Sequence, residues 1–334
     1  MRLAPTASTT VRGSLLGLAL AFALPAAAAE KPARYLWNLA SETGPLRTSA
    51  SGVSIDPFAH EILVSCGDAV RIYQPNGMED FSFQVAGMMD RVLAAAALGE
   101  NGDIALLGVS GQDSVLARVS FRGELVGRIE RRGEAFPADF HPNVLRVHAS
   151  QLYLADTTRL LAVVLEQDGQ VVKSVDLGEI AGVEDAKRSD NQLSGFGVDV
   201  DGGLLFTISV KFKAWAVSPS GDVRSWGTPG GAPGFFNVVS GIAADQSNYY
   251  VADQLKSAVI AFSRADLSFV DEFGYRREAA GGLIGPTNLA AGNGRVFVSQ
   301  DANRGVAVFS APEADVKVSA AVDATASRGE AATQ

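Results

Sequence analysis

The chain has 334 residues, of which 47% are hydrophobic and 19% charged, and its formal net charge is −9. It contains one cysteine, Cys66, so no internal disulfide can form, and a chain of this length can bury a core that folds without one. An acidic chain without clusters of basic residues is poorly suited to nucleic acids or anionic lipid surfaces, which excludes those binding classes.

The first 29 residues have the pattern of a secretory signal peptide. Arg2 and Arg12 give a positive start, residues 14–24 form an apolar run, and Ala29 ends a small-residue cleavage pattern before Glu30. The run is too short to span a bilayer. Without the two arginines, the remaining chain carries −9 − 2 = −11. We therefore expect an exported protein with no transmembrane span, periplasmic or secreted after cleavage near Ala29.

A pattern of short strands and tight turns recurs along the rest of the chain. Each unit reads as four short β-rich runs separated by Gly, Asp or Asn turns. Successive units begin about 42 to 51 residues apart, near positions 52, 94, 144, 195, 241 and 288. This period is typical of a β-propeller, and six units predict an all-β fold with six four-stranded blades.

The two ends of the repeat region predict how the ring closes. The sixth unit ends at 306–309 without a fourth strand, and residues 34–39 form a strand-like segment with no unit of its own. We expect this N-terminal strand to complete the last blade, because an open or seven-bladed array needs strands that the sequence does not contain. The propeller then covers residues 30–312. Residues 313–334 are rich in Ala and Glu and lack aromatic side chains, which predicts a flexible tail.

The clearest units resemble the NHL repeat. Residues 240–262 contain Ser-Gly-Ile-Ala-Ala-Asp, then Tyr-Val-Ala-Asp, then Val-Ile-Ala-Phe, and residues 286–309 follow the same order with Asn288 where the family has glycine. The resemblance is good over 225–310 and weak over 44–220. It implies a propeller whose usual role is binding or scaffolding, and a fold alone supplies no activity.

Four asparagines that precede or begin the innermost strands are the candidate ligand-binding residues at the channel mouth: Asn143, Asn191, Asn237 and Asn288. Six-bladed lactonases resemble one another in a central Ca²⁺ held by Glu, Asn and Asp, and here no glutamate occupies an equivalent position. A channel Ca²⁺ is therefore an alternative to the simpler interpretation that these asparagines cap turns. No resident cofactor, catalytic residue or metal ligand is assigned.

The other polar candidates are interpreted as structural. Related six-bladed lyases need several pocket-facing histidines, whereas His60, His141 and His148 are interpreted as turn and surface residues. Asp156, Asp253 and Asp301 recur after the second strand of their units, where a short acidic side chain accepts backbone N–H bonds and holds the turn. Cys66 lies in an apolar run and is expected to be a buried structural thiol.

These observations favour a monomeric, non-catalytic propeller that serves as a protein- or ligand-binding scaffold in the periplasm or at the cell surface. The expected partner is an envelope or extracellular protein, including a membrane or redox complex. One alternative is a cation-dependent lactonase- or lyase-like hydrolase that uses the central channel. The other is a sugar-binding face, which requires Trp215, Trp226 and Tyr275 to line one exposed groove.

Overall fold

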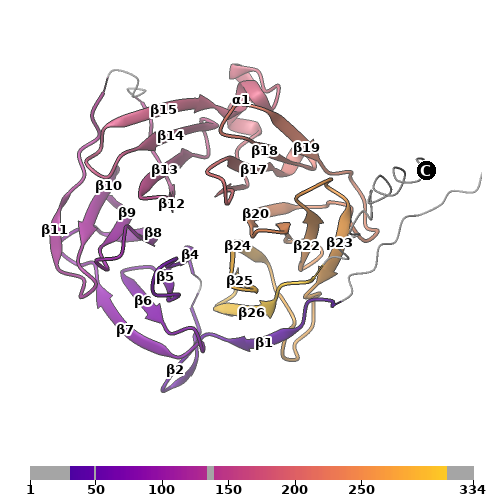
Figure 1. Cartoon of the computed structure of the whole chain (residues 1–334), viewed down its shortest axis with the longest axis horizontal. Helices are drawn as coiled ribbons and strands as arrows, with labels where there is room; N and C mark the ends of the chain where they lie inside the picture. Colours follow the sequence, from indigo (N-terminus) through magenta and orange to yellow (C-terminus); the bar gives the residue numbers. More distant parts are fainter. Residues whose placement is uncertain (1–30, 49, 134–138, 314–334) are drawn as a thin grey trace, which may run out of the picture.

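The computed structural model describes residues 31–48, 50–133 and 139–313. The predicted signal peptide and the predicted tail beyond residue 313 lie outside the described residues. Within them the chain forms six four-stranded antiparallel sheets, arranged as blades around a central axis (Figure 1). The predicted fold class, a six-bladed all-β propeller, is confirmed.

Blades 1 to 5 each consist of four consecutive strands, numbered from the axis outward (Figure 1). Blade 1 contains β4 (Gly52–Ile55), β5 (Ile62–Cys66), β6 (Ala69–Tyr73) and β7 (Glu79–Gln84). Blade 2 contains β8 (Arg91–Ala97), β9 (Ile104–Ser110), β10 (Asp113–Val119) and β11 (Leu125–Arg128). Blade 3 contains β12 (Val144–His148), β13 (Gln151–Asp156), β14 (Leu161–Leu165) and β15 (Val171–Asp176). Blade 4 contains β16 (Gly195–Val198), β17 (Leu204–Ile208), β18 (Lys213–Val217) and β19 (Val223–Trp226). Blade 5 contains β20 (Val239–Ala244), β21 (Asn248–Asp253), β22 (Ala258–Ser263) and β23 (Phe269–Phe273).

Blade 6 joins the two ends of the propeller. Its inner strands are β24 (Pro286–Gly292), β25 (Arg295–Gln300) and β26 (Val306–Ser310), and its outermost strand is β1 (Tyr35–Asn38). Tyr35 pairs with Phe309 across the antiparallel ladder, and the Leu39 N–H donates to the Val306 carbonyl at 3.0 Å. The predicted closure of the ring by the N-terminal strand is confirmed (Figure 1).

The remaining described elements are short. They are a two-stranded hairpin of β2 (Ala40–Ser41) and β3 (Gly44–Pro45), the helix α1 (Leu177–Ile180), and the 3₁₀ turns η1 (Asp185–Asp190) and η2 (Ser209–Lys211). None of the helices in the described part of the chain has the length and apolar character needed to cross a bilayer.

Six hydrophobic cores hold the ring together, and each lies between two neighbouring blades. Consecutive residues of a strand point to opposite faces of its sheet. In β9, for example, Leu106 packs in the core shared with blade 1 and Leu107 in the core shared with blade 3. Both faces of every blade are therefore buried, which explains why the middle strands are apolar almost without interruption.

The innermost strands run in the same direction around the axis and approach one another closely. Ser51 donates to the Val92 carbonyl at 3.1 Å and Ser54 to the Ala95 carbonyl at 2.7 Å, so β4 and β8 are parallel. Small residues permit this approach. A Cβ atom on Gly197 of β16 would lie 2.7 Å from the Ile242 carbonyl oxygen of β20. The small residues of the innermost strands therefore allow these strands to lie close together around the axis.

Two of the three recurring aspartates, Asp156 and Asp253, hold turns as predicted. Asp156 accepts hydrogen bonds from the backbone N–H groups of His141, Thr158 and Arg159 at 2.9 to 3.1 Å. Asp253 accepts in the same way from Asn237 at 2.6 Å. Each carboxylate ties the loop that enters its own blade to the turn after the second strand.

Candidate functional site

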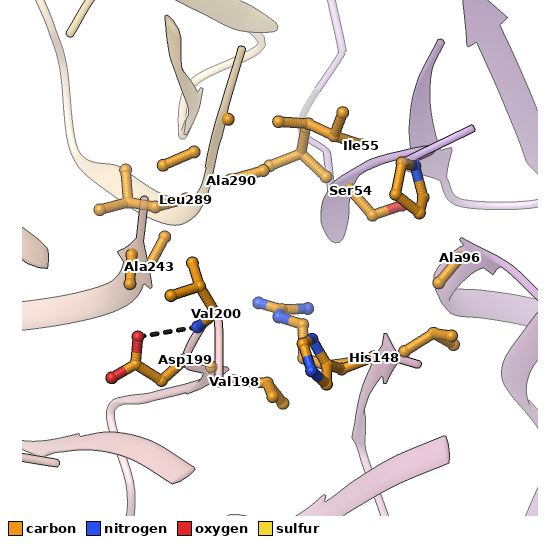
Figure 2. Close-up of a pocket in the computed structure, with 18 of the residues that line it drawn as sticks. Ser54, Ile55, Ala96, His148, Val198, Asp199, Val200, Ala243, Leu289 and Ala290 are labelled. Atoms are coloured by element: carbon orange, nitrogen blue, oxygen red, sulfur yellow. Dashed lines mark hydrogen bonds between the residues drawn. The ribbon is translucent and has the colours of Figure 1, made fainter. Parts of the chain in front are cut away.

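A cavity of about 360 Å³ lies on the axis of the ring, where the innermost strands of all six blades meet (Figure 2). Most of its wall comes from small and aliphatic side chains, among them Ile55, Ala96, Val198, Ala243 and Leu289. The cavity is formed by the later residues of these strands and the turns that follow them. It therefore occupies the end of the channel at which the innermost strands finish.

One strand supplies two nitrogen-bearing side chains to this apolar wall. Arg146 and His148 both lie on β12, two residues apart, and so share one face of the strand. The other innermost strands present Gly, Ala, Ser, Val, Leu or Ile to the cavity. Figure 2 shows the His148 ring at the edge of the cavity, and the ring also makes an edge contact with Tyr153, with centroids 6.4 Å apart.

The Arg146 guanidinium has no counter-ion in the part of the chain that the structure describes. It donates one hydrogen bond, from Nη1 to the carbonyl of Leu145 at 3.0 Å, and among the described residues no carboxylate pairs with it. Burial by the surrounding protein lowers the pKa of Arg146 to about 10. The side chain therefore keeps its positive charge at neutral pH.

The acidic residue in the cavity wall, Asp199, is engaged elsewhere. Its Oδ1 accepts from the Val200 N–H at 2.7 Å and pairs with Arg264 Nε at 2.9 Å, while its Oδ2 accepts from the Tyr249 hydroxyl at 2.8 Å. Figure 2 shows the carboxylate turned toward the Val200 N–H and not toward the centre of the cavity. Asp199 therefore does not neutralise Arg146.

The four asparagines named from the sequence lie away from this cavity, and none of them lines it. Asn143 and Asn288 stand where innermost strands begin, which is the opposite end of the channel. Asn143 donates to Thr157 Oγ1 at 2.7 Å, Asn191 to the Lys187 carbonyl at 2.9 Å, and Asn288 to the Ser51 carbonyl at 3.2 Å. The backbone N–H of Asn237 bonds to Asp253. The ligand-binding role of the four asparagines stays a prediction.

The histidines and tryptophans also differ in their surroundings. His60 and His141 are exposed, in keeping with the sequence interpretation, whereas His148 faces the axial cavity. Trp215 and Trp226 are only 5% and 7% exposed because they pack in the cores on either side of blade 4. The sugar-binding alternative needed both rings on an exposed groove and is therefore wrong. Within the described ranges, no group of three or more His, Cys, Asp or Glu side chains could hold a metal ion.

Cys66 is buried, and burial raises the pKa of its thiol to about 11. Because the thiolate is the reactive form, we expect negligible alkylation by iodoacetamide in the native protein at pH 8. Labelling should become fast once guanidinium unfolds the chain. Mass spectrometry of timed aliquots measures both rates, with Ser220→Cys in an exposed turn as the reactive control. Equal labelling of Cys66 and the control in the native state would contradict a structural thiol.

No protein-family model matches the chain, and no curated protein is similar to it in sequence. Solved structures are similar in fold. A catalytically inactive virginiamycin B lyase from Staphylococcus aureus, solved with quinupristin, has a TM-score of 0.57 at 10% identity, over 84% of this chain and 99% of that one. A protein of unknown function from Bacteroides thetaiotaomicron has a TM-score of 0.58 at 12% sequence identity, over 84% of this chain and 76% of that one. The PQQ-bound aldose sugar dehydrogenase from Streptomyces coelicolor has a TM-score of 0.51 at 13% sequence identity, over 84% of this chain and 98% of that one. At these identities the similarity shows the propeller fold alone.

Proposed function

We propose that this protein is an NHL-type propeller that binds a small molecule in its axial cavity. Its role is that of a non-catalytic binding protein in the periplasm or at the cell surface, where it serves an envelope or extracellular partner protein. The observation that carries the proposal is the cavity itself, because all six innermost strands contribute to its wall. No single blade could form it.

The size and chemistry of the cavity support this role. Ligand pockets measure about 300–1,000 Å³ and combine an apolar wall with a few polar groups that orient the ligand. The axial cavity has about 360 Å³ and an aliphatic wall, and Arg146, His148 and the amide side chain of Asn293 are among its polar groups. The cores between blades support the strands that form this wall.

The repeat pattern and the N-terminal pattern support the other parts of the proposal. The NHL-like phrases at 240–262 and 286–309 are typical of propellers that bind or scaffold. The signal-like first 29 residues point to export. The net negative charge of the remaining chain favours solubility.

A larger side chain at the mouth of the cavity tests the proposal. Val200 lines the cavity just after β16 (Figure 2), so Val200→Phe should obstruct it. We expect protein purified from its own envelope fraction to carry a small-molecule adduct in native mass spectrometry. We also expect the dialysable fraction of that extract to raise its melting temperature. Val200→Phe should lose both effects.

Leu255→Phe is the matched control, because Leu255 is 70% exposed in the turn between β21 and β22 and lies outside the cavity. It should keep the adduct and the thermal response. Wild-type protein that carries no small molecule and does not respond to the extract would contradict the proposal. The same holds if Val200→Phe retains the adduct.

A further inference from the structure

The axial cavity holds a positive charge that the fold does not neutralise. Arg146 lies on the innermost strand of blade 3, and within the described residues its guanidinium donates one hydrogen bond, to the backbone carbonyl of Leu145. The acidic residue in the cavity wall, Asp199, is already bonded to Val200, Arg264 and Tyr249. Arg146 is half-buried in the wall of the cavity. A charge that is partly withdrawn from water without a partner is costly, so folded proteins pair such groups or use them to bind a ligand.

The surrounding residues do not explain Arg146 as a structural element. Among the described residues its side chain bridges no pair of blades through hydrogen bonds. Arg264 differs, because it joins blade 5 to Asp199 in the turn after β16 of blade 4. At the neighbouring places in the cavity wall, other blades use small residues such as Ser54, Gly197 and Ala243. A small residue would therefore be enough to pack this point of the ring, and packing alone does not require a guanidinium there.

The chemistry of the wall defines a complementary ligand. A guanidinium offers paired N–H donors that match the two oxygens of a carboxylate or phosphate, and such charge-assisted hydrogen bonds are strong away from water. His148, two residues further along β12, adds a second nitrogen group on the same side. The aliphatic side chains opposite, including Leu289 and Val198, suit a carbon skeleton.

The net negative charge of the whole chain does not oppose such a ligand at close range. Exposed acidic side chains are screened within about 8 Å at physiological ionic strength, whereas a charge inside the ring is screened much less. The local charge of the cavity therefore decides which ligands it accepts.

We propose that the axial cavity binds a small organic anion, with the Arg146 guanidinium holding its carboxylate or phosphate group and the aliphatic wall holding its apolar body. This inference rests on the proposed small-molecule binding function and adds the class of ligand. Carboxylate and phosphate ligands of this class share a group of anionic oxygens attached to a short carbon chain.

Four probes of similar size test it: hexanoate, hexyl phosphate, the neutral hexanamide and the cationic hexylamine. Ligand-observed NMR titrations at constant ionic strength give the affinities. We expect at least one anionic probe to bind at least about tenfold more tightly than hexanamide, since a hydrogen bond to a charged group contributes more than one between neutral groups. Hexylamine should bind most weakly. The tighter of hexanoate and hexyl phosphate identifies the head group.

Three variants locate the selectivity. Arg146→Met keeps an unbranched stem and should remove the preference for anions, and Arg146→Lys should keep part of it because the charge remains. Arg128→Met is the matched control, since Arg128 is an exposed arginine on the outermost strand of blade 2. It should keep the full preference. A preference for anions that survives in Arg146→Met would overturn the inference.

Thermal unfolding separates a binding role from a structural one. Because the wild-type cavity holds an unneutralised charge, Arg146→Met should melt at a higher temperature than the wild type without ligand. It should also lose the stabilisation that the anionic probe gives to the wild type. A variant that melts at a lower temperature and still binds the anionic probe would assign Arg146 to the fold and contradict the proposal.

The outcomes distinguish this inference from the proposed function. If hexanamide binds as tightly as both anions and Val200→Phe abolishes all binding, the cavity is a ligand site without anion selectivity and only the present inference is wrong. If no probe binds and Val200→Phe has no effect on adducts from the native extract, both proposals are wrong.

Discussion

Deleting residues 31–41 should lower the melting temperature by about 10–20 °C, because this segment contains β1 and completes blade 6. Leu39, which follows β1, is 0% exposed in the core between blades 6 and 1. Losing such a side chain alone removes about 2–5 kcal/mol. The pairing with β26 and the edge contact of Tyr35 with Phe309, at 5.9 Å between centroids, are lost as well.

Differential scanning calorimetry measures this effect, and light scattering measures its consequence. Without β1, the edge of β26 is exposed and should promote self-association. Leu36→Ala is the control, since Leu36 belongs to the same strand but is 37% exposed, and it should change stability by no more than about 0.5 kcal/mol. A deletion variant that melts cooperatively at the wild-type temperature would show that β1 is dispensable for closure.

Gly195→Ala and Gly241→Ala should each destabilise the protein by about 3 kcal/mol, because both glycines lie where innermost strands meet. A Cβ atom on Gly195 would collide with the carbonyl oxygen of Ser240, and one on Gly241 with the carbonyl oxygen of Thr287. These contacts are to backbone, which cannot rotate away as a side chain can. The ring would have to widen at that point.

Urea denaturation followed by circular dichroism measures the change in unfolding free energy. Gly127→Ala is the matched control on the outermost strand of blade 2, since a Cβ atom there meets no other atom within 4 Å. It should be close to neutral. Equal effects at all three positions would contradict the assignment of Gly195 and Gly241 to the spacing of the inner strands, because the effect of alanine on the unfolded chain alone is stabilising.

The architecture could be predicted from the sequence because its signals are local. The turns between third and fourth strands end in Gly77, Gly169 and Gly221, which have φ values of 88°, 91° and 96°. Only glycine adopts such angles without strain, so the same residue recurs at the same place in several blades. The unpaired segment near Trp37 then had one remaining position, beside the last strand.

The site could not be predicted in the same way. In Val144-Leu-Arg-Val-His148 the alternation of side chains is visible, but the face that points to the axis depends on how all six blades pack. The candidate asparagines precede or begin innermost strands, whereas the cavity lies where these strands end. One signal was available. Arg146 is a charged residue in an innermost strand, at a point where other blades carry small or aliphatic residues.

The closure of blade 6 also determines when, during synthesis and folding, the last blade can form. Arg34 and Ser310, which pair through a backbone hydrogen bond, lie 276 residues apart in the chain. Because a nascent chain emerges with its N-terminus first, β1 has no partner until almost all of the propeller has been synthesised. Contacts between such distant segments form slowly. The axial cavity, which requires all six innermost strands, therefore becomes competent for ligands only after β24 has joined the ring.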